Sequence, residues 1–375
     1  MKTLREITDL KDKKVLLRVD FDVPVSEKGQ IEEPFRIKKQ KEMLDYLIEH
    51  GAKVVMVAHI SATSSFADLV PQLHILIGVE FDFIKTVTDI PTWLMGSGRV
   101  ALLDNIRNPA VAGEGPSFAS TDKKAMEGKE EKNDPEFAKQ LAQGFDLYIN
   151  NAFAVCHRDH ASVSEITKFL PSYAGFIIEQ EVAQLTKVIE APKDGKVVII
   201  GGAKASTKVP VIKNLLDKSE SILLGGVVAN DVLKEKQQDM GSSVVDADAH
   251  DLLVGLDLND SRLVIPKDFI IFDNKILDIG DETMRHYMDI VGKAKTIIWN
   301  GPLGLFENPV FAKGTNEIAQ AIVASSAFKI IGGGDTISAV DKIGLLEKFD
   351  FVSTGGGAML AFLAGDKLPG IEALN

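Results

Sequence analysis

Cysteine is almost absent from this 375-residue chain, where Cys156 stands alone. A single cysteine excludes an internal disulfide and a thiolate-based structural zinc site, and it fits a reducing compartment. Long apolar runs are also missing, since no stretch approaches the roughly eighteen residues of a membrane span. The N-terminal MKTLREITDLKDKK lacks the apolar core and the cleavage site of a signal peptide. These absences predict a cytoplasmic protein with no membrane partner.

Basic residues are outnumbered, with 42 lysines and arginines against 54 aspartates and glutamates and a formal net charge of -12. Nucleic acids and anionic membranes attract a basic surface, so neither is an expected partner. Two nucleotide-binding motifs are missing as well. No G-x-x-x-x-G-K-[ST] occurs, which excludes a P-loop enzyme. GGAKAS (201–206) lacks the third glycine of G-x-G-x-x-G, and the next apolar run ends in glycine rather than an acid, which disfavours a nicotinamide dehydrogenase.

What the sequence does contain is a regular alternation of short apolar runs with longer amphipathic stretches. This pattern predicts strand-helix units that build parallel sheets buried on both faces. The runs lie at 14–19, 53–58, 99–103 and 146–149 in the first half, and at 196–200, 221–224, 296–299, 328–331 and 350–353 in the second. Because the chain is too long for one ordinary core, we predict an α/β protein of two domains.

Three stretches between these runs have a distinct character. Residues 36–51 predict a helix closed by Gly51. Residues 172–195 are long and periodic, and we predict a helix there that joins the two domains, so that domain motion would be a hinge. Residues 108–133 are small, polar and charged, and we predict a surface loop or insertion to which no chemistry is assigned.

Polar and charged side chains follow the strands of the first half. Ligands of open parallel sheets bind beyond the carboxyl ends of the strands, so these residues are expected on one rim. They are Asp20, Asp22, His59, Asn105, Arg107, Asn150, Asn151, His157, Arg158 and His160, and Arg36 joins them. Three arginines and three histidines predict an anion site, because the planar guanidinium suits carboxylate and phosphate oxygens. A single arginine could as readily cap a helix or pair with a surface acid.

Two other interpretations of this rim find less support. His59, His157 and His160 could be metal ligands, but the neighbouring arginines would repel a cation. Cys156 beside His157 could be a nucleophile pair, but adjacent side chains on a strand or loop usually point apart, and no oxyanion site is indicated.

Glycine follows the strands of the second half, in GGAKASTK (201–208), GGVVAND (225–231), NGPLGLFE (300–307), GGGDTIS (332–338) and GGGAML (355–360). Glycine lets a backbone approach a ligand closely, and amide N–H groups at helix N-termini bind phosphate. One such turn is often only steric, but five predict a nucleotide site. Lys204 and Lys208 are expected on one helix face beside the phosphates, with solvated surface lysines as the alternative. Asp335 is placed to hold magnesium and Thr336 to meet a phosphate.

These motifs together resemble the phosphoglycerate kinase family over essentially the whole chain. The matching pieces are RVDFDVP (18–24), FRI (35–37), DNIR (104–107), NNAFAVCHRDHAS (150–162), GGAKASTK (201–208), WNGPLGLFE (299–307), IGGGDT (331–336) and STGGGAML (353–360). The resemblance implies two Rossmann-like three-layer domains joined by a helix and hinge. Residues 1–171 would bind 3-phosphoglycerate, 172–192 would form the connecting helix and 193–361 would bind the nucleotide, with 362–375 packing back onto the first domain.

The resemblance also implies a reaction: reversible phosphoryl transfer between 1,3-bisphosphoglycerate and ADP, giving 3-phosphoglycerate and ATP in glycolysis. It would proceed by hinge closure and charge neutralisation without a covalent intermediate. Mg2+ would enter as MgADP or MgATP, and the fold of the family suggests a monomer. Arg36 matches the catalytic arginine of the family, and Lys204 would share that role.

The binding positions implied by the resemblance fall in both halves. The acceptor positions are Asp20, Asp22, Arg36, His59, Arg107 and Arg158. The nucleotide positions are Gly201, Gly202, Lys204, Lys208, Gly225, Gly226, Asn300, Pro302, Glu307, Gly333, Gly334, Asp335 and Thr336, with Glu307 at the ribose and Asp335 at the magnesium ion.

The chain departs from the pattern of the family chiefly in the acceptor site. Ala62 stands where the family has an arginine, and one lost contact of that kind costs about 1.5 to 3 kcal/mol, or roughly ten- to a hundredfold in affinity. Asp22 replaces an asparagine and adds negative charge. The other exchanges are Asn151 for aspartate, Ala154 for glycine, Thr207 for aspartate and Ile276 for a glycine near the adenine pocket.

These departures leave three hypotheses. The chain is a working phosphoglycerate kinase, a kinase of another small anionic acceptor, or a non-catalytic nucleotide-binding relative. A protein that had lost catalysis would have no need of its phosphoryl-transfer groups, so the retention of Arg36, Lys204, Lys208 and Asp335 favours the first. Nucleotide preference cannot be read from the sequence.

Overall fold

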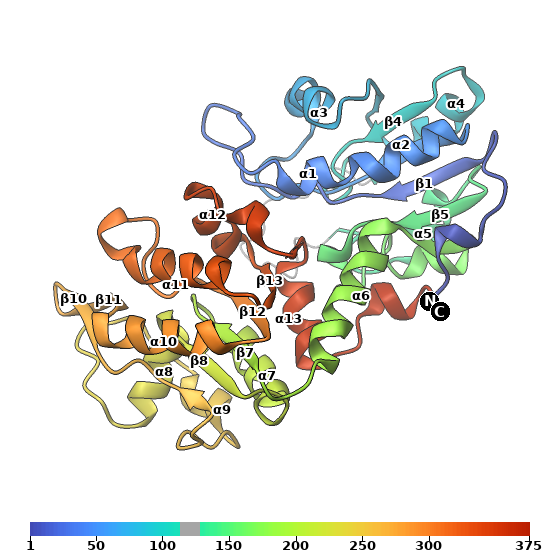
Figure 1. Cartoon of the computed structure of the whole chain (residues 1–375). Helices are drawn as coiled ribbons and strands as arrows, with labels where there is room; N and C mark the ends of the chain where they lie inside the picture. Colours follow the sequence, from blue (N-terminus) through green and yellow to red (C-terminus); the bar gives the residue numbers. More distant parts are fainter. Residues whose placement is uncertain (113–127) are drawn as a thin grey trace. The chain divides into compact units, whose positions relative to one another are not determined.

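The computed structural model describes residues 1–112 and 128–375, so part of the loop predicted at 108–133 lies outside the described residues. The chain divides into two compact units (Figure 1). Unit 1 comprises Met1–Val182 and Lys367–Asn375, and unit 2 comprises Ala183–Asp366. The division falls within helix α6 (Phe176–Glu190). In the described residues, no helix has the length and apolar character needed to cross a bilayer.

Unit 1 is built on a parallel sheet with the strand order β3-β4-β2-β1-β5-β6. Its strands are β1 (Lys14–Arg18), β2 (Lys53–Val57), β3 (Asp82–Ile84), β4 (Val100–Leu103), β5 (Leu147–Asn150) and β6 (Ser172–Ala174). Its helices are α1 (Phe35–Lys39), α2 (Lys41–Glu49), α3 (Val70–Ile77), α4 (Ile90–Met95), α5 (Pro135–Leu141) and α14 (Pro369–Glu372), together with the start of α6.

The two faces of this sheet carry separate apolar cores. Val15 and Leu17 of β1 pack into one core with Leu44 and Leu47 of α2. Leu16, between them in the sequence, points the other way and packs with residues of α4 and α5. Because successive side chains of a strand alternate between faces, a strand of continuous apolar residues has to be covered by helices on both sides. Unit 1 is therefore a three-layer α/β structure.

Unit 2 repeats this design with a parallel sheet of order β14-β13-β12-β7-β8-β9 and an antiparallel hairpin, β10-β11. Its strands are β7 (Lys196–Ile200), β8 (Ser221–Leu224), β9 (Leu263–Val264), β10 (Phe269–Phe272), β11 (Lys275–Ile279), β12 (Thr296–Asn300), β13 (Phe328–Gly332) and β14 (Phe351–Ser353). Its helices are α7 (Ala205–Leu215), α8 (Gly226–Glu235), α9 (Ala249–Leu253), α10 (Asp281–Lys293), α11 (Lys313–Ala324), α12 (Gly334–Lys342) and α13 (Gly356–Ala364).

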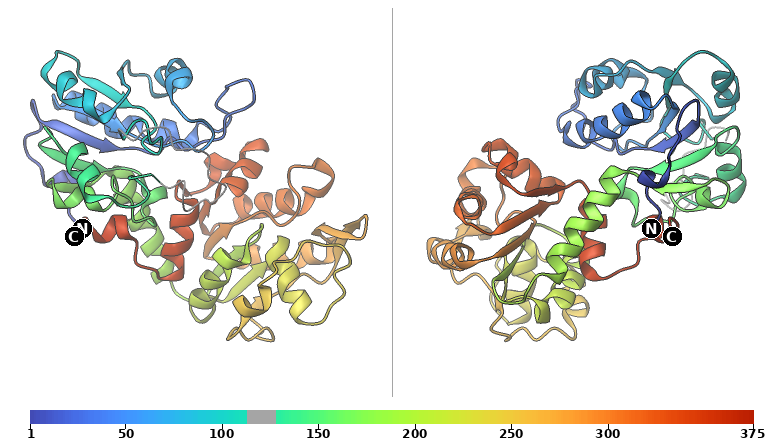
Figure 2. Two further views of the ribbon diagram at one scale, coloured as in Figure 1. Left: turned by 180° about the vertical axis from the view of Figure 1, so that it is seen from behind. Right: turned by 45° about the vertical axis from the view of Figure 1, so that its right-hand side comes forward.

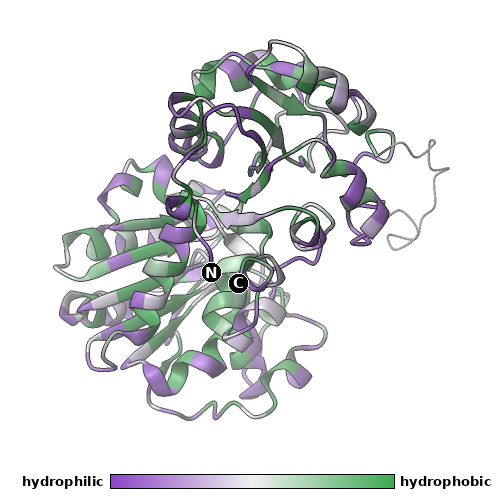
Figure 3. Ribbon diagram, turned by 90° about the vertical axis from the view of Figure 1, so that its right-hand side faces the viewer, coloured by the Kyte–Doolittle hydropathy of each residue, from purple (hydrophilic) through white to green (hydrophobic). Residues whose placement is uncertain are grey.

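The hydropathy of the chain follows these layers, with hydrophobic strands inside and mixed helices outside (Figure 3). Strands β7 and β12 are buried along their whole length and pair in register, with Thr296 opposite Lys196 and Asn300 opposite Ile200. The predicted fold class, α/β with two parallel sheets, is confirmed.

Some predicted elements differ from the structure. The helix predicted over 172–192 is wrong at its N-terminus, because Ser172–Ala174 form β6 and pair with β5. Pro171 precedes this strand and Gly175 follows it, so α6 begins only at Phe176. The predicted helix over 36–51 is two helices, α1 and α2, that meet at Gln40. The short strands β3, β6 and β9 and the hairpin were not predicted.

The two ends of the chain lie side by side in unit 1 (Figure 2). The Lys2 N–H donates to the Leu374 carbonyl at 2.9 Å, and the Gly370 N–H donates to the Cys156 carbonyl at 2.9 Å. Leu368 and Leu374 are buried. The final residues therefore complete the core of unit 1 rather than trailing from unit 2.

Candidate functional site

The carboxyl end of β1 carries two acids of the predicted rim. One oxygen of Asp20, Oδ1, accepts the Asp22 N–H at 3.1 Å. The other, Oδ2, is buried and has no hydrogen-bond partner among the described residues, although Arg36 Nη1 lies 3.8 Å away. Arg36, on α1, donates from Nη1 to the Asp22 carbonyl at 3.1 Å. Asp20 thus offers a free acceptor oxygen beside an arginine.

His59, after β2, joins this group between Arg18 and Asp22. Its Nε2 lies 3.2 Å from Asp22 Oδ2, and its Nδ1 lies 3.1 Å from Arg18 Nη2. Arg18 is fully buried and also donates to the carbonyls of Val19 and Val57. This arginine was not predicted as a site residue, because a basic residue within an apolar run gives no sign of which way it points.

Burial and the charges of the arginines lower the pKa values of several basic groups in the rim. Burial lowers the pKa of Arg107, and the charge of Arg158 lowers it further, while Glu131 opposes the shift. Burial, together with Arg107, Arg18 and Arg158, lowers the pKa of His160 to about 3. Burial and then Arg158 also lower the pKa of His157. Burial, reinforced by the charges of the arginines, favours neutral histidines at neutral pH and leaves the positive charge of the rim on the arginines, which suits an anion.

Arg107 contacts the stretch 108–133, to which no chemistry was assigned from its sequence. Its Nε lies 3.4 Å from Glu131, but Nε and Nη2 are buried without a hydrogen-bond partner in the described part of the chain. The neighbouring Glu130 is buried and accepts from Ser162 Oγ at 2.6 Å and from the Ser162 N–H at 2.9 Å. Glu130 therefore fixes the loop that bears Arg158. Its partner lies 32 residues away, so no local pattern could have identified it.

The remaining polar residues of the predicted rim are structural. Asn105 Nδ2 donates to the carbonyls of Ile60 and Thr63. Asn151 donates to Gln40 and accepts the Ile177 N–H in the first turn of α6. Cys156 is buried near Asn150, and burial raises the pKa of its thiol, so it is not an activated nucleophile.

In unit 2, the ends of β7 and β12 interlock through glycine. The Gly201 N–H donates to the Asn300 carbonyl at 3.0 Å, and the Gly202 N–H donates to the Pro302 carbonyl at 2.7 Å. A Cβ at Gly201 or at Gly301 would collide with backbone atoms of the other loop. The end of β8 belongs to the same arrangement, because the Gly225 N–H donates to the Ile200 carbonyl and the Gly226 N–H donates to the Leu303 carbonyl.

The two predicted lysines lie in different environments. Lys204 is the N-cap of α7, with a left-handed backbone (φ 67°), and its side chain is exposed. Lys208, inside α7, is buried and donates from Nζ to Asn300 Oδ1. Burial lowers the pKa of Lys208 to about 8, although Asp335 opposes the shift. Because α7 begins at Ala205, the helical spacing expected to align the two lysines does not apply.

The start of α12 lies beside Lys208. Thr336 Oγ1 accepts the Gly301 N–H at 2.7 Å, and a Cβ at Gly333 (φ 95°) would press on Asn300 and Thr336. Gly333 is the N-cap of α12, and Gly334 and Asp335 form its first turn. Unpaired N–H groups of a helix N-terminus beside a buried lysine suit a phosphate.

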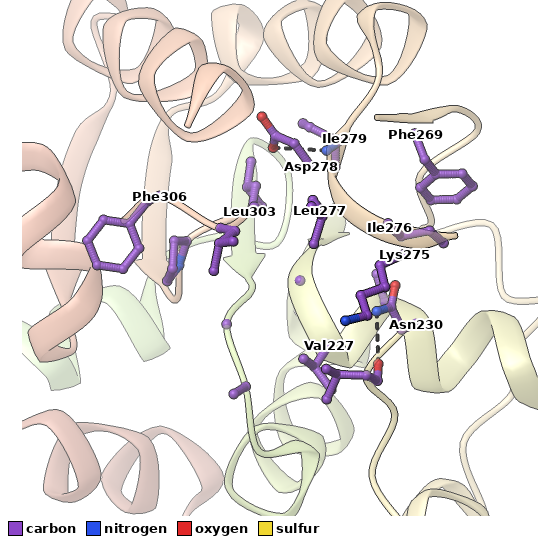
Figure 4. A pocket seen from close by; sticks show the side chains of 18 of the residues that line it. Val227, Asn230, Phe269, Lys275, Ile276, Leu277, Asp278, Ile279, Leu303 and Phe306 are labelled. Atoms are coloured by element: carbon purple, nitrogen blue, oxygen red, sulfur yellow. Dashed lines mark hydrogen bonds between the residues drawn. The ribbon is translucent and has the colours of Figure 1, made fainter. Parts of the chain in front are cut away.

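A pocket of about 210 Å³ adjoins these loops, and Figure 4 shows it from close by. Apolar side chains from α8, from β11 and from the loop after β12 form most of its wall, among them Val227, Ile276, Leu277, Leu303 and Phe306. Of the predicted nucleotide residues, Gly202, Gly226, Pro302, Glu307 and Asp335 line it. Most of the pocket wall is apolar, and Asp278, Glu307 and Asp335 also line it, a combination that suits a purine and its ribose. Ile276, which stands where a glycine was expected near the adenine pocket, also lines this pocket.

A divalent ion could be held here only in part by the protein. Within residues 1–112 and 128–375, no group of three or more His, Cys, Asp or Glu side chains is placed to hold a metal. Asp335 lines the pocket, as Asp278 and Glu307 do, and its charge acts on Lys208. This arrangement fits magnesium that arrives with the phosphates of a nucleotide and keeps most of its ligands from them.

An arginine-rich rim at the strand ends of one α/β unit, and an apolar pocket near a buried lysine at those of the other, fit a nucleotide-dependent kinase of a small anion. The family model of phosphoglycerate kinase matches residues 4–366. Similar curated relatives are the phosphoglycerate kinases of Herpetosiphon aurantiacus, 37% identical over 407 aligned positions, and of Prochlorococcus marinus, 38% identical over 407. These alignments cover 100% and 98% of this chain, and 98% and 97% of the relatives.

Solved structures agree. The phosphoglycerate kinase of Pyrococcus horikoshii superposes with a TM-score of 0.83 at 28% identity, covering 100% of this chain and 98% of that one. That of Coxiella burnetii gives a TM-score of 0.79 at 30% identity, covering 99% and 98%. The chain belongs to the phosphoglycerate kinase family, whose enzymes are glycolytic phosphotransferases that use a nucleotide substrate.

Proposed function

We propose that this chain carries out the reaction of its family, reversible phosphoryl transfer between 1,3-bisphosphoglycerate and ADP, with the phosphoglycerate (the acceptor in the reverse direction) on unit 1 and the nucleotide on unit 2. The observation that carries the proposal is the pair of complementary sites at the strand ends. One is an arginine-rich rim, in which Arg107 has unpaired buried nitrogens. The other is an apolar pocket beside a buried lysine.

The acceptor is expected to use the unsatisfied groups of the rim. Arg107 and Arg158 suit the phosphate of 3-phosphoglycerate, since a guanidinium binds phosphate oxygens in a bidentate manner. The buried, unpartnered Oδ2 of Asp20 suits the hydroxyl group, because a carboxylate can only accept. Arg36 lies near Asp20 Oδ2 and donates to the Asp22 carbonyl, and its guanidinium suits the carboxyl group that exchanges the phosphoryl.

The nucleotide is expected to place its base and ribose in the apolar pocket, with Glu307 at the ribose hydroxyls. Its phosphates would then lie at Lys208 and at the starts of α7, α8 and α12, which the glycines 201, 202, 225, 226, 333 and 334 precede or begin. Asn300 positions Lys208 by accepting its hydrogen bond, and Thr336 stabilises the turn at Gly301 by accepting the Gly301 N–H. Magnesium, bound to the phosphates and Asp335, would neutralise their charge.

Transfer itself requires little covalent chemistry from the protein. We infer that the two units close on each other, that Arg36 and Lys204 neutralise the phosphoryl in flight, and that no enzyme intermediate forms. Lys204 is exposed on a left-handed N-cap, so its ammonium group is free to reach the phosphoryl. Closure also excludes water, which would otherwise hydrolyse the acyl phosphate.

The test is a coupled assay with 1,3-bisphosphoglycerate and MgADP. Wild-type protein is expected to form ATP, and Arg36→Ala and Lys204→Ala are each expected to lower kcat by about 100-fold or more while KM changes less. Lys293→Ala, at an exposed lysine ending α10, is the matched control and keeps full activity. No ATP formation by the wild type, or equal loss in the control, would contradict the proposal.

A second candidate, a kinase of another small anionic acceptor, is favoured by the exchanges at Asp22 and Ala62. If the acceptor is 3-phosphoglycerate, Ala62→Arg supplies a missing contact and lowers its KM by roughly tenfold or more. A higher KM in this variant, with faster turnover of a different carboxylate by the wild type, would favour the second candidate. We also propose a cytoplasmic monomer, for which size-exclusion chromatography would give a mass near 40.7 kDa.

A further inference from the structure

Asp22 places a negative charge in a rim that should receive an anion. Its carboxylate nevertheless contacts its own chain on both oxygens, with Oδ2 at 3.2 Å from His59 Nε2 and Oδ1 accepting the Ser61 N–H at 2.7 Å. Burial alone would raise the pKa of Asp22, but His59 and Ser61 hold it well below its usual range. Asp22 is therefore ionised at neutral pH, and both of its oxygens are engaged.

The opposite edge of the His59 ring is held by Arg18. A guanidinium can only donate, so the contact of 3.1 Å between Arg18 Nη2 and His59 Nδ1 requires Nδ1 to accept, which places the ring proton on Nε2. Burial, with the charges of Arg18 and Arg107, lowers the pKa of His59 to about 4 despite Asp22. At neutral pH the contact with Asp22 is thus a hydrogen bond from neutral imidazole rather than an ion pair.

Asp22 also holds the residue proposed to act on the phosphoryl. Its backbone carbonyl accepts from Arg36 Nη1 at 3.1 Å. A single residue after β1 therefore contacts the loop after β2, through His59 and Ser61, and α1, through Arg36. The charged groups facing His59 are Arg18, Arg107 and Asp22, with His160 nearby and neutral.

We propose that Asp22 is a positioning residue of the acceptor site, and that its hold on His59 and the Ser61 turn strengthens acceptor binding more than its charge weakens it. This inference rests on the proposed function, since it assumes an anionic acceptor on unit 1. The alternative, that Asp22 acts only by repelling the acceptor, predicts the opposite sign for the same substitution.

The substitution is Asp22→Asn, which keeps the shape, removes the charge and leaves one acceptor oxygen for two donors. The KM for 3-phosphoglycerate is expected to rise about fivefold or more, as the loss of one charge-assisted hydrogen bond implies. Both kcat and the KM for MgATP should stay within about twofold. Asp22→Ala, which loses both contacts, should raise the acceptor KM further. Asp45→Asn removes a half-buried acid of α2 that pairs with Lys41, and it is the control for charge, with no change in the acceptor KM expected.

A lower or unchanged acceptor KM in Asp22→Asn would overturn the inference. A second measurement is independent of activity: NMR of protein labelled with 15N in its histidine rings. The wild type should show a His59 Nε2 proton protected from exchange, and Asp22→Asn should lose that protection while Asp45→Asn retains it. No protected His59 proton in the wild type would overturn the inference, whereas a wild type that makes no ATP would instead overturn the proposed function.

Discussion

Lys208 is a buried ammonium group that, in the proposed function, binds an anion, the phosphates of the nucleotide. Burial lowers its pKa to about 8 from an ordinary value of 10.5, and Asn300 is a neutral partner. Removing a cation from water is costly unless a counter-charge is present, so the residue is suited to bind phosphate and poorly suited to stabilise the free protein. Binding and stability should therefore respond to pH in opposite directions.

Nucleotide affinity is expected to fall as pH rises through the pKa of Lys208, because only the protonated amine attracts phosphate. The dissociation constant of MgADP should increase several-fold between pH 7 and pH 9, by titration calorimetry. Lys208→Met should bind weakly at both pH values with little pH dependence. The same steep pH dependence in Lys208→Met would show that another group titrates.

The stability of the nucleotide-free protein has the reverse dependence. The pKa of Lys208 is lower in the folded than in the unfolded state, so the unfolded chain binds more protons and the free energy of unfolding rises between about pH 8 and pH 10.5. Lys208→Met removes the desolvated charge and should stabilise the protein at pH 7 by an amount on the order of 3 kcal/mol, measured by urea denaturation. A destabilised variant would contradict this account.

At the scale of elements, the nucleotide site depends on how two strand-end loops interlock. Gly301 has a left-handed backbone (φ 97°), and a Cβ there would overlap the backbone of Gly201. Neither loop can yield without breaking the bonds at the ends of β7 and β12. The loops after β7 and β12 are therefore mechanically coupled, and a substitution in either loop disturbs both.

Gly301→Ala is expected to destabilise unit 2 by about 3 kcal/mol or more, since both strain and overlap act there. It should also weaken MgADP binding. Gly292→Ala is the matched control: Gly292 lies within α10 with open space around it, so alanine should stabilise by roughly 0.5 to 1 kcal/mol. Denaturation of both variants measures the difference, and similar effects would contradict the interlocking.

The elements also show what the sequence could predict. β7 and β8 match their predicted bounds, because each is a continuous apolar run that begins after a charged or polar residue and ends at glycine, as buried strands of a parallel sheet do. The hairpin β10-β11 was missed, although its first strand, Phe269–Phe272, is also a continuous apolar run; most of that strand is exposed, and the run alone does not reveal this. The rim residues could be found from their place after strands, but the hydrogen bonds of His59 and Glu130 could not, because their partners are distant in the sequence.

At the scale of the whole molecule, unit 1 contains both ends of the chain. Its last segment, Lys367–Asn375, contributes Leu368 and Leu374 to the core and bonds to Lys2 and Cys156. Each buried leucine is worth about 1.5 to 3 kcal/mol, so this segment supplies a substantial part of the stability of unit 1.

Deletion of residues 367–375 is therefore expected to lower the stability of unit 1 and leave unit 2 intact. Hydrogen exchange followed by mass spectrometry should show lost protection in β1 and β5, with β7 and β12 unchanged. MgADP binding should survive, whereas acceptor turnover should fail. Equal loss of protection in both units would show that they unfold as one.

The same feature orders the events of synthesis. Unit 2 is a single uninterrupted stretch, whereas unit 1 begins the chain and is completed only by its last residues. On a translating ribosome, synthesis of unit 2 therefore starts after that of unit 1 but is completed before it. Unit 2 can fold while the earlier strands of unit 1 still lack the segment 367–375, which is synthesised after unit 2.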